Sequence, residues 1–499
     1  MFYRFFHKKP HPTQQHGDQS SDSNAGSNDD INRQMTRSIG LGQLTLIGVG
    51  STLGTGIFFA MAETVPVAGP AVIVAFVVAA LVAGLTALCY AEVSSALPIS
   101  GASYTFTYVT MGEGIAVMVA ACLLLEWGIA GAAVSVGWSA YLNQLVEMVT
   151  GHSIPAAWSS PPFLNSGSGL ELGGSGIVNL PAIAVVWLCT LLLLRGSKAS
   201  ARLNALLTVT KVSILLLFVV MTLPVFRAEH LAPFIPFGFT GVSTAAAIIF
   251  FSFVGLDSVV NAGEEALHPQ RNIPRAILGA LVVVTTVYVL VAVSSLGVQS
   301  YDSFTGVSGS LPAILLKATQ SPVSSVLLAT GAVISIFSVT FLTLFGQARI
   351  YLAMARDGLL PSRFARLHHR NESPMAATLL SGFMITPLAG FLPSHVLWAM
   401  VSLGTLMVFI AVAVALILLR RQRRAANRNS GCTSSGFQVP GYPWTPLASI
   451  VACLYLIANL SGTVFTLFAV WLTLSLLFYA AFGQRQAQRV NRRHGSMAT

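Results

Sequence analysis

The sequence contains few charged residues, and this shortage argues against a soluble protein. Asp, Glu, Lys and Arg make up 9% of the 499 residues, whereas a soluble domain is expected to carry about 25%. Hydrophobic residues make up 54%, so the sequence predicts a polytopic membrane protein. The five cysteines lie mostly in apolar segments and their number is odd, so no disulfide framework is expected.

Several motifs of other protein classes are also missing. The ten histidines show no metal-ligand spacing, and the phosphate-binding loop of ATP-driven transporters does not occur. No residue set suggests an intramembrane catalytic site, so we expect no enzyme activity, no metal and no cofactor. The net charge of +10 is spread over short basic clusters between apolar segments, so no nucleic-acid partner is expected.

Apolar segments long enough to cross a bilayer, about 20 residues each, fill most of the chain. Residues 1–40 are polar and are expected to form a disordered tail, followed by a membrane domain at 41–482 and a second tail at 483–499. Twelve membrane spans are expected, near 43–64, 70–97, 114–146, 177–195, 203–225, 243–262, 275–298, 322–346, 375–393, 395–419, 446–461 and 463–482.

The basic residues indicate the orientation, because cytoplasmic loops are enriched in Lys and Arg. With the N-terminus in the cytoplasm, the outer loops hold only Arg227 and Lys317 of the basic residues that lie between spans. Both termini are therefore expected in the cytoplasm, in the plasma (cell inner) membrane. The basic clusters would also face the anionic membrane lipids.

The first span contains a glycine-rich stretch, GVGSTLGTGIFF at 48–59, that disfavours a continuous helix. Each interior glycine costs about 1 kcal/mol relative to alanine. A break near residues 51–56 would leave carbonyls and N–H groups free for a polar ligand such as an amino acid, which carries both charges. The alternative is a small-residue seam for helix packing.

A second interruption is expected at Gly255 in the sixth span, within IIFFSFVGLDSVVNAGEE at 248–265. Asp257 is expected to cap the helix that resumes there, with direct substrate contact as the alternative. Two interrupted spans at corresponding positions of two five-helix halves are typical of an inverted-repeat transporter. The halves are expected at about 41–225 and 243–419, followed by two extra helices at 446–482.

Five motifs cover much of the chain, and all but the N-terminal tail and some loops take part in one resemblance. They are GVGSTLGTGIF at 48–58, CYAEVSSALPISGASYTFTYVTMGE at 89–113, FSFVGLDSVVNAGEEALHPQRNIPRAI at 251–277, GQARIYLAMARDGLLP at 346–361 and FQVPGYPWTPLASIVACLYLIANL at 437–460. With these motifs the chain resembles the amino acid–polyamine–organocation superfamily of permeases, and within it the cationic amino acid transporter family with its bacterial relatives. The resemblance implies an all-α, twelve-helix, LeuT-like fold with broken helices 1 and 6.

The resemblance also implies a substrate site between the two breaks. Backbone N–H groups after the first break would bind the substrate carboxylate, namely those of Gly54, Thr55 and Gly56. Backbone carbonyls at both breaks would bind the substrate ammonium, namely those of Gly50, Ser51, Phe250 and Ser252. Phe253, just before Gly255, would be the gate that closes over the bound amino acid.

Two charged residues are expected deep inside spans, where each is a candidate for function. Lys211 lies roughly 13 Å along the fifth span from Arg202, too far to reach the interface easily. A buried lysine can exchange a proton near neutral pH, and the resemblance implies proton coupling here; a fixed structural cation is the alternative. Glu126, near the middle of the third span, is a possible counter-charge for a cationic substrate or a member of a polar network.

Other acidic residues are expected nearer the span ends. Glu92 is expected to be solvated at the interface. Glu264 and Glu265 precede a basic loop and are expected to pair with its arginines.

These features predict a secondary active transporter of amino acids, coupled to protons and working by alternating access. An amino acid exchanger and a non-transporting amino acid sensor are the alternatives, and the sequence leaves open whether the substrate is cationic or neutral. The outer loop at 147–176 has no cysteine. Heterodimeric exchangers of the superfamily anchor a heavy subunit through a cysteine there, so no such subunit is expected.

Overall fold

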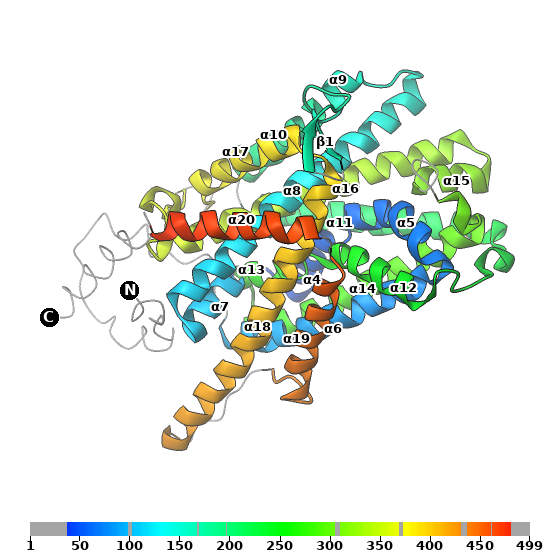
Figure 1. The fold of residues 1–499 in the computed structure, drawn as a ribbon. Helices are drawn as coiled ribbons and strands as arrows, with labels where there is room; N and C mark the ends of the chain where they lie inside the picture. Colours follow the sequence, from blue (N-terminus) through cyan, green and yellow to red (C-terminus); the bar gives the residue numbers. More distant parts are fainter. Residues whose placement is uncertain are drawn as a thin grey trace.

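The computed structural model describes residues 37–97, 102–166, 169–195, 197–304, 310–368, 373–430, 437–460 and 462–480. Within these ranges the protein is a bundle of helices from which one small β-hairpin projects (Figure 1). Eight of the described helical segments are long and apolar enough to cross a membrane, and four shorter apolar helices accompany them. The protein is therefore a polytopic helical membrane protein, as its composition predicts.

Helix is found in each of the twelve predicted segments. The first half contains α4 (Leu41–Thr52), α5 (Thr55–Ala68), α6 (Val72–Ala96), α7 (Ala102–Met111), α8 (Glu113–Thr150), α9 (Ala156–Ser159), β1 (Phe163–Ser166), β2 (Gly169–Leu172), α10 (Leu180–Leu193) and α11 (Ser197–Thr222). The second half contains α12 (Gly238–Ile249), α13 (Ser258–Asn261), α14 (Pro269–Val298), α15 (Leu311–Thr319), α16 (Pro322–Arg356), α17 (Met375–Phe391), α18 (Ser394–Ser430), α19 (Trp444–Ala458) and α20 (Gly462–Phe478). Short 3-10 turns extend or join these helices: η1 (Gly69–Ala71), η2 (Leu223–Val225), η3 (Ala228–Leu231), η4 (Phe250–Phe253), η5 (Gly263–Glu265), η6 (Tyr301–Ser303) and η8 (Ser362–Ala365).

Local sequence explains several helix ends. Asn179 accepts a hydrogen bond from the N–H of Ala182 at 3.1 Å and so caps the start of α10. Gly151 ends α8 with a φ of +73°, which glycine adopts without strain. By contrast α16 continues to Arg356, ten residues past the predicted end of its span at residue 346, because residues 347–357 include no glycine or proline.

Two parts of the structure differ from the sequence prediction. The outer loop contains a β-hairpin in which Phe163 pairs with Leu172 and Ser166 with Gly169, so the all-α description is incomplete. Ile39, assigned to the disordered tail, instead forms a parallel bridge with Ala266. Residues 1–36 and the predicted second tail at 483–499 lie outside the described residues.

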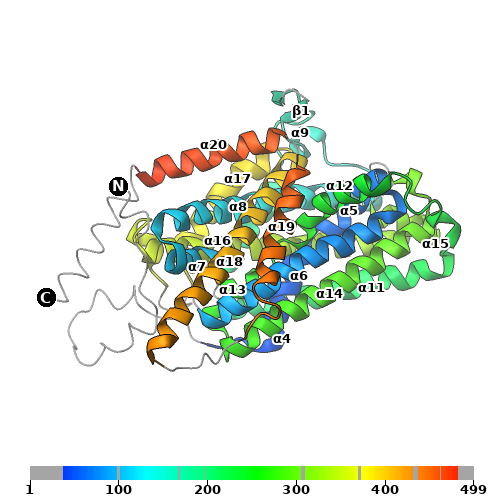
Figure 2. The same ribbon diagram turned by 60° about the horizontal axis from the view of Figure 1, so that its bottom comes forward.

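The interrupted spans lie side by side in the centre of the bundle. α4 packs against α11 and α14, and α5 packs against α12. α14 also runs beside α6 (Figure 2), and α8 packs along both α16 and α18. The last two helices are peripheral: α19 contacts α6 and α18, and α20 contacts α8 and α18.

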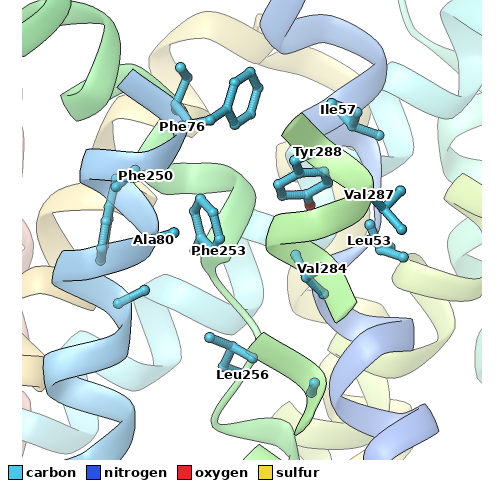
Figure 3. Close-up of a cluster of buried hydrophobic side chains, with 14 of the residues drawn as sticks. Leu53, Ile57, Phe76, Ala80, Phe250, Phe253, Leu256, Val284, Val287 and Tyr288 are labelled. Carbon is cyan, nitrogen blue, oxygen red and sulfur yellow. The ribbon is translucent and has the colours of Figure 1, made fainter. Parts of the chain in front are cut away.

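A cluster of buried apolar side chains connects the first interrupted span with α6, η4 and α14 (Figure 3). The Tyr288 ring lies 5.4 Å from the Phe253 ring and 5.7 Å from the Phe76 ring, centroid to centroid. Lipid tails are as apolar as these side chains, so close van der Waals packing is what favours such contacts within a membrane. This cluster fixes the position of both interrupted spans.

Candidate functional site

The first interrupted span breaks at Leu53 and Gly54, between α4 and α5. None of the described side chains caps α5, and the first N–H groups of an α-helix have no partner within the helix. These groups and the helix dipole give the start of α5 a partial positive charge. This end of α5 is therefore suited to bind a carboxylate.

The second interrupted span breaks after η4, where residues 254–257 form no helix before α13 begins. Gly255 has a φ of +104°, which residues with a side chain rarely adopt. A Cβ at Gly255 would also lie 3.0 Å from the carbonyl oxygen of Ser51. The Ser51 hydroxyl donates to the Gly255 carbonyl at 2.6 Å. Glycine is thus required both by its conformation and by the close approach of the two breaks.

Tyr288 on α14 forms a second bridge between the breaks. Its hydroxyl lies 2.7 Å from the carbonyl of Thr52 and 2.7 Å from the carbonyl of Ser252, and can donate to both. This role of Tyr288 was not predicted from the sequence. The available signal was a polar aromatic side chain in the otherwise apolar segment LVVVTTVYVLVAV at 281–293.

Lys211 lies at the first break. Its ammonium donates to the carbonyl of Gly50, to the carbonyl of Leu53 at 2.7 Å and to the hydroxyl of Ser338 at 2.9 Å. The side chain is fully buried, and its hydrogen-bond partners among the described residues include no carboxylate. The carbonyl of Gly50, which was expected to contact the substrate, accepts a hydrogen bond from Lys211.

A cavity of about 440 Å³ lies between the two breaks. Its lining includes several residues expected from the sequence, together with apolar side chains of α8 and α16. The described lining residues are Ser51, Thr52, Gly54, Gly56, Glu126, Trp127, Ala130, Val134, Phe251, Ser252, Val254, Gly255, Val339 and Thr343. Gly50, Phe250 and Phe253 are not among them, and the side chain of Thr55 lies outside the described part of the structure.

The predicted gate residue faces away from this cavity. Phe253 is fully buried in the apolar cluster against Tyr288 (Figure 3). Phe250 packs against Phe409 at 5.7 Å between ring centroids. Phe251 lines the cavity instead and stacks on Trp398 at 5.2 Å. Residues 251 and 253 face different sides because successive side chains of a 3-10 turn point about 120° apart.

Two buried acidic residues lie close to the breaks: Glu126 lines this cavity, whereas Asp257 lines a smaller cavity beside α6 and α14. Neither carboxylate oxygen of Glu126 or Asp257 has a hydrogen-bond partner among the described residues. The Thr405 hydroxyl lies near Glu126, and the Trp127 indole lies near Asp257, without a well-formed hydrogen bond. Asp257 occupies the N-cap position of α13, but its side chain makes no capping bond. The predicted cap is therefore absent.

Two ion pairs connect distant helices outside the cavity. Glu92 is buried and accepts from Nε of Arg420 at 2.6 Å and from Nη2 at 2.5 Å, so it is not solvated as predicted. Glu265 pairs with Arg349 on α16, so the prediction of a partner in the basic loop after Glu265 was wrong. The side chain of Glu264 lies outside the described residues.

Comparison with known proteins gives a consistent assignment. The amino acid permease family matches residues 39–484. The branched-chain amino acid permease BcaP of Bacillus subtilis (strain 168) is 36% identical over 91% of this chain and 95% of that protein. The methylthioribose transporter of the same strain is 35% identical over the same shares. The chloroplastic cationic amino acid transporter 9 of Arabidopsis thaliana is 32% identical over 81% of this chain and 70% of that protein.

Proposed function

This chain belongs to the amino acid permease family, and we propose that it is a secondary active transporter that carries an amino acid by proton symport and alternating access. The observation that carries the proposal is the cavity between the two breaks, where the uncapped start of α5 meets the unwound residues 254–257. A helix start binds a carboxylate, and unwound carbonyls bind an ammonium group. A zwitterionic amino acid complements both.

The same proposal includes the membrane arrangement. The chain would cross the membrane twelve times, with inverted repeats at about 41–225 and 243–419 and with α19 and α20 as the extra helices. Each repeat begins with an interrupted helix, and the two interruptions contact each other. The basic residues favour cytoplasmic termini and a plasma-membrane location, with lipid as the surroundings.

Lys211 is the proposed proton-coupling residue. A protonated ammonium has three N–H donors, and Lys211 has three acceptors: Gly50, Leu53 and Ser338. Loss of the proton would remove one donor, so that only two of the three partners could still accept an N–H. It would therefore weaken the attachment of the first break to α11 and α16. In this way proton release and opening of the cavity would be coupled.

The cavity walls favour a neutral substrate with an aliphatic side chain. Ala130, Val134, Val254 and Val339 supply apolar surface, and Phe251 supplies an aromatic ring. Substrate pockets are lined by apolar side chains where an apolar ligand group is bound. The relative BcaP is named a branched-chain amino acid permease. Phe251, rather than Phe253, would close over the bound substrate.

A cationic substrate is the second candidate, and it is favoured by one observation. Glu126 lines the cavity with both carboxylate oxygens unpartnered among the described residues. A lysine or arginine side chain would supply the missing donors. The Arabidopsis relative is named a cationic amino acid transporter.

Uptake into liposomes that contain the purified protein tests the function. Labelled leucine and labelled arginine are offered separately, with the exterior acidic or at the interior pH and with no amino acid inside. We expect leucine to accumulate only under the acidic exterior, and a protonophore to abolish the accumulation. Liposomes without protein are the control.

The other outcomes identify the alternatives. Uptake that requires an internal amino acid and ignores the pH gradient would make the protein an exchanger. Binding of leucine or arginine without any uptake would make it a sensor. Accumulation of arginine alone would reverse the assignment of the substrate and give Glu126 the role of counter-charge.

A further inference from the structure

A second cavity, of about 280 Å³, lies where α10 ends, α16 approaches its end and α17 begins. Its described lining residues are Leu193, Phe345, Ala348, Arg349, Ser373, Pro374 and Thr378. None of these residues lines the first cavity. The second cavity is therefore a separate site.

Arg349 is a buried hydrogen-bond donor at this cavity. Only 3% of its surface is exposed, and its guanidinium carbon lies 3.3 Å from the centre of the Phe345 ring. Nη2 pairs with Glu265, whereas Nε has no hydrogen-bond partner among the described residues. One guanidinium thus satisfies an ion pair and still presents an unused N–H.

The other two polar side chains of this cavity are hydroxyls, and one of them has an unused donor. The Ser373 hydroxyl is buried and, within the described part of the chain, has no hydrogen-bond partner. The Thr378 hydroxyl donates to the carbonyl of Pro374 at 3.1 Å. The start of α17, a helix of 17 residues, adds a partial positive charge. The described lining residues include no carboxylate.

Buried polar groups are hydrogen-bonded in nearly all proteins. Two unpartnered buried donors at one cavity, with an arginine and a helix start beside them, are suited to an acceptor that carries negative charge. A carboxylate or a phosphate group is such an acceptor, because both present oxygen atoms in the geometry that an arginine recognises.

The second cavity lies along the same helix, α16, as the first cavity. Thr343 lines the first cavity and Arg349 lines the second, six residues later on α16, which is about 9 Å along the helix. Glu265, the partner of Arg349, belongs to η5 and follows the second break. Movement of that segment would release further N–H donors of Arg349.

We propose that the second cavity is a carboxylate-binding site, which takes the carboxylate of the substrate after it leaves the first cavity. The identification of the ligand as the substrate rests on the proposed function. The hydrogen-bond donors of the cavity are observed independently of that function.

Acetate, which is a carboxylate without an ammonium group, is the probe. The melting midpoint of the purified full-length protein is measured against acetate concentration, with chloride added to constant ionic strength. Ser373→Ala removes one donor and leaves the Arg349–Glu265 pair in place. Arg349→Lys keeps the positive charge for Glu265 but removes Nε. Ser295→Ala is the matched control, because Ser295 is also buried, its hydroxyl is unpartnered among the described residues, and it lines neither cavity.

We expect acetate to stabilise the parent protein and Ser295→Ala equally. In Ser373→Ala and in Arg349→Lys the dissociation constant should rise about tenfold, because each loses a hydrogen bond to a charged group. Equal stabilisation of all four proteins would overturn the proposal.

Two further arms distinguish the source of the oxyanion. Inorganic phosphate replaces acetate in one, and vesicles of phosphatidylglycerol replace it in the other. Stabilisation that depends on Ser373 but occurs only with phosphate or with the lipid would overturn the assignment to a carboxylate. Acetate binding that depends on Ser373 in a protein without amino acid uptake would refute the proposed function and leave the carboxylate site intact.

Discussion

The substitution Tyr288→Phe tests the bridge between the two breaks. It removes the hydroxyl that contacts the carbonyls of Thr52 and Ser252 and keeps the ring that packs against Phe253 and Phe76. A buried hydrogen bond contributes about 1 kcal/mol, and an unpaired buried polar group costs about 1–3 kcal/mol. The hydroxyl has a single proton for two carbonyls, so the energies of two full hydrogen bonds are not added. We expect the substitution to cost about 1–3 kcal/mol of free energy in total.

The loss should appear in substrate affinity, because the bridged carbonyls border the cavity. A loss of this size raises the dissociation constant of the substrate about 5- to 150-fold. Equilibrium binding of labelled leucine to the purified protein measures this, and its melting midpoint is recorded in parallel. The assay rests on the proposed substrate; labelled arginine replaces leucine if only arginine is taken up.

Tyr141→Phe is the matched control for this experiment. Tyr141 is buried, and its hydroxyl donates at 3.0 Å to the carbonyl of Phe58, inside α5 rather than at a break. We expect this variant to lose stability and to keep its affinity. Equal affinities of the two variants and the parent would refute a bridging role for Tyr288 in the site.

Three other substitutions test the remaining parts of the site. Lys211→Met removes the ammonium and keeps an apolar chain, so uptake into liposomes should lose its dependence on the pH gradient while exchange continues; uptake still driven by the gradient would contradict proton coupling. Gly255→Ala introduces a Cβ at a φ of +104° and should lower stability by about 1–3 kcal/mol. A lower melting midpoint is the readout, and Gly263→Ala, whose Cβ would lie 3.4 Å from its nearest neighbour, is the control expected to change little. Glu126→Gln should preserve leucine uptake and abolish any arginine uptake, and loss of leucine uptake would show that a neutral substrate also needs the carboxylate.

The breaks were predictable because their cause is local. Glycine weakens a helix wherever it stands, so the cluster at 48–56 indicated an interruption, and the structure breaks there at Leu53 and Gly54. Gly255 indicated the second break in the same way, and its φ of +104° gives the physical reason. The burial of Lys211 was also predictable, because the residue lies far from Arg202 along an apolar helix.

The direction of side chains at the breaks was not predictable. Phe253 and Phe251 are both aromatic and two positions apart, and only the 3-10 turn η4 decides which one lines the cavity. Asp257 stands where a capping residue is expected, yet its carboxylate makes no cap. Local sequence gives the position of such residues, and packing against α6 and α14 gives their orientation.

The amino-acid sequence by itself determined the membrane class, the apolar segments and the positions of the breaks, because each follows from composition or from backbone preference over a few residues. Only the tertiary structure decided the pairings between distant segments. Glu92 with Arg420, Tyr288 with the two breaks, and Arg349 with Glu265 are examples. The reason is physical: a buried polar group pairs with whichever partner the packing of helices brings within hydrogen-bonding distance. The number of residues between two groups in the sequence does not determine the distance between them.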